Sequence, residues 1–115
     1  MNFRDIIHRG HESYKVAGLE SLINLIAKNK VEIDKIIIPD DFNNLDKAYF
    51  FSRLGDAYVD YCNVHSAEHQ GAIMVLAKEC YLKAIKFAND FKDCDILDKE
   101  YFKTKLVFIE DNNLI

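Results

Sequence analysis

The chain has 115 residues and a formal net charge of −4, with half of its residues apolar and 30% charged. This composition is typical of a folded globular protein and argues against an intrinsically disordered chain. A chain of this length can enclose one hydrophobic core, so we expect a single domain over residues 1–115. The acidic balance provides no basic surface for nucleic acid or for an anionic membrane, but it suits a basic partner.

The short apolar runs and the cysteines indicate the compartment. Apolar runs such as residues 36–38 are far too short to cross a bilayer. Residues 1–14 lack the apolar core and the cleavage site of a signal peptide. Cys62, Cys80 and Cys94 are widely spaced and form no C-x-x-C pair, which indicates free thiols and not a disulfide framework or a zinc site. We therefore expect a cytoplasmic protein.

The N-terminal part of the chain has apolar residues at helical spacing. The pattern predicts helix from residue 2 to about residue 28. Gly10 and Gly18 each weaken a helix by roughly 1 kcal/mol relative to alanine. A kink at these glycines and two shorter helices are both open alternatives.

Two later segments fit either helix or strand. Residues 33–38 have isoleucines spaced as in one helical turn, but their isoleucine run also suits a strand, and Pro39 disfavours helix at the preceding residue. Residues 106–109 fit a helix or a strand paired with that run. The segment "PDDFNN", residues 39–44, predicts a turn and a helix-capping region.

The centre of the chain predicts two long helices. Residues 45–62 and 70–91 place apolar residues at steps of three and four, the spacing of one buried helix face. Asp98 is suited to cap a last helix. The predicted fold class is therefore all-α, a compact bundle of four or five helices around a long antiparallel helical hairpin. The last helix would contribute Tyr101, Phe102, Leu106 and Ile109 to its core.

Both halves of this hairpin carry residues at the spacing of a known helical repeat. The first helix contains "FSRLGDAY" and the second contains "AKECYLKA". Their small residues would let two antiparallel helices approach closely, while the rings fill the space between them. Residues 48–89 therefore resemble a single divergent tetratricopeptide repeat. The residues that carry this resemblance are Phe51, Leu54, Gly55, Tyr58, Ala77, Tyr81 and Ala84.

The chain departs from the repeat pattern in three respects. Phe51 replaces the usual tryptophan, and Asn89 stands where the closing proline is expected. About ten extra residues separate the two half-motifs, so either each helix is longer or the turn carries an insertion. Only one repeat is present, whereas solenoids need about three to share a continuous core. Flanking helices would have to cap the hairpin.

The resemblance implies a binding surface on the first helix of the hairpin. In the family, the exposed face of that helix lines a concave peptide-binding groove. The outward-pointing candidates are Tyr49, Ser52, Asp56, Val59 and Asp60. Asp56 and Asp60 are four residues apart and share a helix face, and an acidic groove would favour a ligand that contains lysine or arginine.

The segment "HSAEH" matches the H-x-x-E-H pattern of inverted zincins. In a helix, His65 and His69 could ligate one zinc ion while Glu68 holds a water. The motif falls at a helix boundary, however, where Ser66 is suited to be an N-cap, and the chain is short for a substrate cleft. We expect no metal, no cofactor and no catalytic residue, and keep a zinc-dependent hydrolase as the alternative of a different class.

These observations predict a non-catalytic protein–protein interaction domain. The first hypothesis is a small acidic helical adaptor that binds a basic protein or peptide, with no nucleic acid or membrane partner. An alternative is an immunity or antitoxin-like inhibitor that neutralises a basic toxin or nuclease, since size and acidity fit both equally. The oligomeric state stays open.

Overall fold

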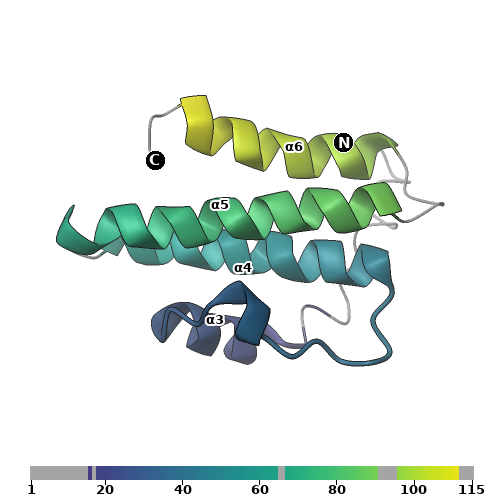
Figure 1. The fold of residues 1–115 in the computed structure, drawn as a ribbon, viewed down its shortest axis with the longest axis horizontal. Coiled ribbons are helices and arrows are strands. Elements are labelled where there is room, and N and C mark those ends of the chain that lie inside the picture. The colour runs from purple at the N-terminus through teal and green to yellow at the C-terminus, as the bar shows by residue number, and fades with distance from the viewer. Residues whose placement is uncertain (1–15, 17, 65–66, 91–95, 112–115) are drawn as a thin grey trace.

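The structure, a computed structural model, describes residues 16, 18–64, 67–90 and 96–111 (Figure 1). Within this part of the chain there are four α-helices and one short 3-10 helix, and no residue forms a strand. The all-α prediction is therefore confirmed. None of the helices in the described part is both long enough and apolar enough to span a membrane. The elements in chain order are α3 (Glu20–Lys28), η1 (Ile33–Lys35), α4 (Asn44–Val64), α5 (Ala67–Asp90) and α6 (Ile96–Asp111).

The hairpin of α4 and α5 is the centre of the fold. The two helices lie side by side along their lengths and share the most extensive interface, with α6 on one side and α3 on the other (Figure 1). Because α4 ends at Val64 and α5 begins at Ala67, the extra residues between the two half-motifs lengthen the helices and not the turn. All seven residues that carry the repeat resemblance are buried.

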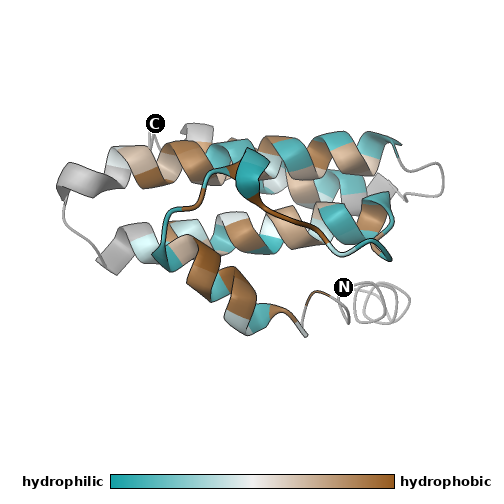
Figure 2. Cartoon of the chain, turned by 60° about the horizontal axis from the view of Figure 1, so that its bottom comes forward, coloured by the Kyte–Doolittle hydropathy of each residue, from teal (hydrophilic) through white to brown (hydrophobic). Residues whose placement is uncertain are grey.

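The N-terminal helical pattern is interrupted at Gly18. This residue lies in a turn, and α3 begins only at Glu20. The earlier part of the predicted helix, residues 2–15, lies outside the described residues. Figure 2 views the molecule from the side of α3 and shows hydrophobic residues over much of this short helix. Ile23 and Ile26 are buried against the hairpin, so burial on one face holds α3 in place.

The end of α3 is fixed by a backbone motif and by a tyrosine of α4. Lys30 has a φ of 52°, and the N–H groups of Lys30 and Val31 donate to the carbonyls of Ala27 and Ile26, which is the Schellman arrangement. The Tyr58 hydroxyl donates to the Val31 carbonyl oxygen at 2.8 Å. The chain that leaves α3 is thereby attached to α4.

The predicted capping region before α4 is confirmed. The Asp46 N–H donates to the Asn43 side-chain oxygen at 2.8 Å, and the Asn43 N–H donates to the Asp46 carboxylate at 3.1 Å. This reciprocal pair is a capping box with aspartate in the place of the usual glutamate. It satisfies two backbone N–H groups and sets the start of α4.

The strand alternative for the two ambiguous segments is wrong. Residues 33–38 form the single turn η1 and then extended backbone, and residues 106–109 lie within α6. Helix is favoured over strand at the C-terminal segment because a helix buries Phe102 and Ile109, seven residues apart, on one face. The predicted N-cap at Asp98 is also wrong, since α6 already begins at Ile96.

Candidate functional site

The exposed face of α4 borders two hollows that together form a groove, here called the α4 groove. One hollow of about 580 Å³ lies towards α6, and one of about 270 Å³ lies towards α3. Asp56 and Asp60 border both of them. The groove is further lined by Glu20, Asn24, Arg53, Ala57, Val59, Tyr81, Tyr101, Thr104, Lys105 and Phe108.

Asp56 is the centre of a polar cluster on the α6 side of the groove. Its two carboxylate oxygens accept hydrogen bonds from Lys105 Nζ at 2.8 and 2.7 Å, and Oδ1 accepts another from the Tyr81 hydroxyl at 2.7 Å. The Lys105 ammonium also lies 4.8 Å from the centroid of the Tyr101 ring, within cation–π distance. Burial, and secondarily the Asp56 charge, raise the pKa of the Tyr81 hydroxyl, so this group stays protonated and donates.

A second ion pair lies on the α3 side. Arg53 donates to the Glu20 carboxylate across α4 and α3, and both side chains are about half exposed. With Asp56 bound to Lys105, four of the five charged side chains of the groove are paired. Asp60 is exposed, and within the described residues no cation pairs with it. The groove therefore presents one carboxylate to a ligand.

Apolar surface lies next to this carboxylate. Phe108 is a large hydrophobic residue with 53% of its surface exposed, and its neighbour Val107 is exposed to a similar degree. Val59 and Tyr101 are half-buried and complete the apolar wall. In protein interfaces generally, apolar contacts supply affinity and charged groups supply specificity.

Three of the five predicted binding residues border the groove, namely Asp56, Val59 and Asp60. The expectation that Tyr49 and Ser52 point outward is wrong, since they are 4% and 1% exposed. Helical spacing correctly assigned these residues to α4, but it does not determine which part of that helix another helix covers.

The Tyr49 ring is covered by side chains of α6. The Tyr49 ring lies 5.1 Å from the Phe102 ring in an edge-on contact and 6.3 Å from the Tyr101 ring, measured between centroids. Ser52 is buried as well, and its hydroxyl has no hydrogen-bond partner among the described residues. These two residues therefore belong to the core and not to the groove.

Sequence reasoning missed the contribution of α5 and α6 to the groove. The α6 residues form a stripe with steps of three and four; Tyr101 among them was assigned to the core, and the others lie beside the predicted core stripe. The helical spacing of these residues can be read in the sequence, but nothing in the sequence places them next to α4. The missed residues are Tyr81, Tyr101, Thr104, Lys105 and Phe108.

The "HSAEH" motif spans the junction of α4 and α5. The backbone of Glu68 and His69 lies in the first turn of α5, whereas His65 and Ser66 lie outside the described residues. The side chains of Glu68 and His69 also lie outside them. In the part of the chain that is described, no group of three or more histidine, cysteine, aspartate or glutamate residues could hold a metal ion. The zinc alternative stays a prediction.

The sequence predicts three free thiols, and the structure describes the side chain of one of these cysteines, Cys80. Cys80 is buried and free, and its burial raises the pKa of the thiol. A buried thiol with a raised pKa is unreactive and packs as a small apolar group. The side chains of Cys62 and Cys94 lie outside the described residues.

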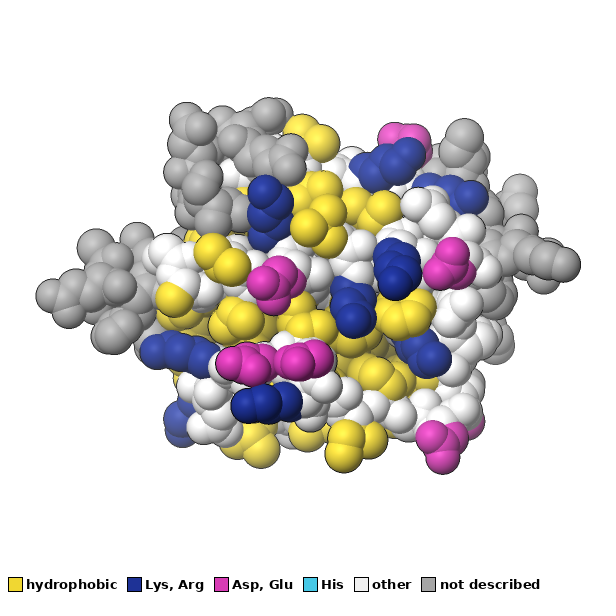
Figure 3. All heavy atoms as spheres, in the orientation of Figure 1, with side chains coloured by type: hydrophobic (Ala, Val, Ile, Leu, Met, Phe, Trp, Pro, Cys, Tyr) yellow, Lys and Arg dark blue, Asp and Glu magenta, His cyan; other side chains and the backbone are white. Residues whose placement is uncertain are grey.

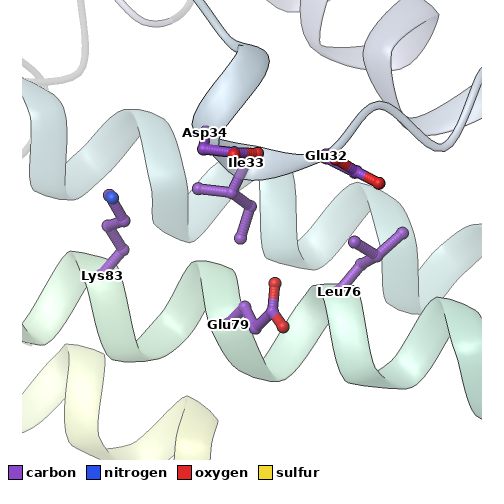
Figure 4. Close-up of a pocket in the computed structure, with 6 residues that line it drawn as sticks. All are labelled: Glu32, Ile33, Asp34, Leu76, Glu79 and Lys83. Carbon is purple, nitrogen blue, oxygen red and sulfur yellow. The ribbon is translucent and has the colours of Figure 1, made fainter.

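Another hollow, of about 530 Å³, lies between η1 and α5 (Figure 4). Ile33 extends from η1 towards α5, where Glu79 stands between Lys83 and Leu76 (Figure 4). Glu32 at its margin pairs with Lys35 at 3.5 Å, and both side chains are well exposed. Within the described residues this hollow brings together no acid–base pair or nucleophile with a hydrogen-bonded partner.

No protein-family model, curated protein or solved structure matches the chain. Its function is therefore argued from the geometry and the chemistry of the site.

Proposed function

We propose that the protein is a protein-binding domain that holds a basic segment of its partner in the α4 groove. The observation that carries this proposal is the Asp60 carboxylate, which no cation of the described residues pairs with, in the same hollow as the exposed Phe108. A segment with a lysine or arginine next to an apolar side chain complements both features. The adaptor and the inhibitor hypotheses use the same groove and differ only in the activity of the partner.

The paired charges of the groove support a single point of electrostatic recognition. Asp56 and Glu20 already hold Lys105 and Arg53, and a ligand cation would have to displace these side chains to reach either carboxylate. Asp60 requires no such displacement. A cation beside Asp60 also lies near Asp56, so the potential there favours a positive group.

The repeat resemblance supports the same surface. Its residues meet across the α4 and α5 interface, where Gly55 lies directly against Tyr81 and the alanines are buried. In the tetratricopeptide family the first helix of such a pair lines the peptide-binding groove, and the resemblance makes α4 the counterpart of that helix. Residues of α6 complete the groove.

Selection from a random peptide display library tests the proposal. We expect the wild-type protein to enrich peptides with a basic residue next to an apolar one. Asp60→Lys should weaken binding of the selected peptides by about tenfold or more, because it places a cation where the ligand cation binds. Asp90→Lys makes the same charge change at an exposed site outside the groove and should leave binding intact. Equal enrichment by both variants would refute the proposal.

A further inference from the structure

The same five-residue pattern occurs once in each helix of the hairpin. Residues 47–51 read "KAYFF" and residues 83–87 read "KAIKF", so both segments have the form K-A-x-x-F. In a helix, the lysine and the phenylalanine of this pattern are four residues apart and share a face. Ala48 and Ala84 are fully buried, which lets the two segments approach closely.

The side chains of the two segments pack against each other across the hairpin. The rings of Phe51 and Phe87 stack with centroids 5.8 Å apart and an angle of 11° between their planes. Lys47 Nζ lies 5.5 Å from the Phe87 centroid, and Lys83 Nζ lies 6.0 Å from the Phe51 centroid. Each lysine therefore extends over the ring of the opposite helix.

Neither ammonium group has a carboxylate partner in the part of the chain that the structure describes. Among the described residues, no aspartate or glutamate lies within ion-pair distance of Lys47 or Lys83. Figure 3 shows basic side chains gathered around hydrophobic atoms over α4 and α5, on the face that Figure 1 presents. Two cations next to a stacked aromatic pair are an arrangement that the net charge of −4 does not predict.

This site borders a hollow of about 300 Å³ that both apolar and charged side chains line. Its volume is at the lower end of the range for small-ligand pockets, and six of the ten residues that line it are apolar. Asp34 and Asp40 are exposed and also line it, so it suits a ligand with one compact anionic group and not a polyanion. The apolar lining consists of Ile33, Ile36, Ile38, Pro39, Phe51 and Phe87.

We propose that this hollow, here termed the lysine–phenylalanine site, binds a small organic monocarboxylate. The carboxylate lies between the Lys47 and Lys83 ammonium groups, and the apolar body contacts the phenylalanine and isoleucine side chains. Binding is non-covalent, and it does not depend on the α4 groove, with which the site shares no residue.

Titration of the protein with 3-phenylpropionate, followed by amide NMR, tests the proposal. We expect saturable shifts at residues 47–51 and 83–87. Phenylpropylamine has the same body with a cation and should give no such shifts, and acetate, which lacks the body, should bind more weakly. Absence of saturable shifts with 3-phenylpropionate at millimolar concentrations, or equal binding of the amine, would overturn the proposal.

Matched variants separate the site from general surface charge. Lys47→Met and Lys83→Met retain an apolar stem over the ring, so the fold should persist, and each should weaken 3-phenylpropionate binding by a similar factor of roughly tenfold. Lys86→Met removes an exposed cation one turn from Lys83 but outside the hollow, and should not change the affinity. Unchanged affinity in both of the first two variants would show that the lysines only cover the rings, and would overturn the proposal.

Discussion

The Tyr81 ring lies so close to Gly55 that a Cβ atom on residue 55 would be 2.5 Å from Tyr81 Cε1. The same tyrosine donates its hydroxyl hydrogen bond to Asp56, the next residue of α4, and Asp56 in turn holds Lys105 of α6. One buried ring therefore links the close packing of the hairpin to the polar cluster of the α4 groove. Because the hydrogen bond and the surrounding core hold the ring, it cannot easily move away from a new methyl group.

Gly55→Ala should lower the free energy of unfolding by about 1–3 kcal/mol, measured by urea denaturation, because it overpacks this contact. Gly71→Ala is the matched control. A Cβ atom on Gly71 would meet no atom within 4 Å, and the residue is exposed within α5. That variant should raise the free energy by about 1 kcal/mol through helix propensity alone. Similar effects of both substitutions would contradict the close contact at Tyr81.

Ser52→Ala should stabilise the protein by about 1 kcal/mol. Its hydroxyl is buried in α4 without a hydrogen-bond partner among the described residues, so its removal relieves a desolvation cost. Ser21→Ala in α3 makes the same substitution at an exposed position and should change stability by no more than about 0.5 kcal/mol. A decrease in the urea midpoint for Ser52→Ala would indicate that the hydroxyl has a partner in solution.

The two ion pairs of the α4 groove should differ in their contribution to stability. The Lys105 side chain is only 19% exposed, whereas Arg53 is 45% exposed. Lys105→Met leaves the partly buried Asp56 without its cation and should cost about 1–2 kcal/mol, while Arg53→Met should cost less than about 0.5 kcal/mol. Thermal denaturation at matched ionic strength compares them. Equal losses would argue that solvent screens both pairs alike.

Stability should fall at alkaline pH. Burial raises the pKa of Cys80, Tyr58 and Tyr81 above their ordinary values of 9.0 for cysteine and 10.0 for tyrosine. Above these values the unfolded chain loses protons that the folded chain retains, so the free energy of unfolding declines as pH rises. The contribution is fully present below about pH 8 and is lost progressively from pH 9 upwards.

Urea denaturation between pH 8 and pH 11 measures this decline, and tyrosine absorbance gives an independent readout. The chain has six tyrosines, and we expect Tyr58 and Tyr81 to ionise only when the protein unfolds. Tyr81→Phe should make the decline less steep by removing one of the three groups. A free energy of unfolding that is constant across this pH range would contradict the burial of these groups.

The sequence was sufficient to predict the long helices but not their mutual arrangement. The periodic apolar residues of α4 and α5 extend over five or more turns, so local spacing alone identifies the buried faces. Tyr49 was misassigned because its burial depends on contact with Phe102 of α6, about 50 residues further along the chain. The same dependence explains why Asp56 was identified while its partner Lys105 was not.

Short segments were also beyond local prediction. Residues 33–38 contain an isoleucine run that suits a strand, yet no described segment offers a partner strand, and Ile33 and Phe42 are instead buried in the helical core. The paired K-A-x-x-F segments were readable in the sequence. That the two segments lie side by side could be seen only from the packing of α4 against α5, which brings Phe51 and Phe87 together.

The central claim, that Asp60 and the surrounding α4 groove bind a basic protein segment, is tested most directly by quantitative affinity capture from the native cell. Wild type, Asp60→Lys and Asp90→Lys should be compared on the same extract. We predict that wild type and Asp90→Lys retain a common protein, that Asp60→Lys loses it, and that a peptide from a basic segment of that protein displaces it. Equal retention of the same proteins by all three would contradict the account.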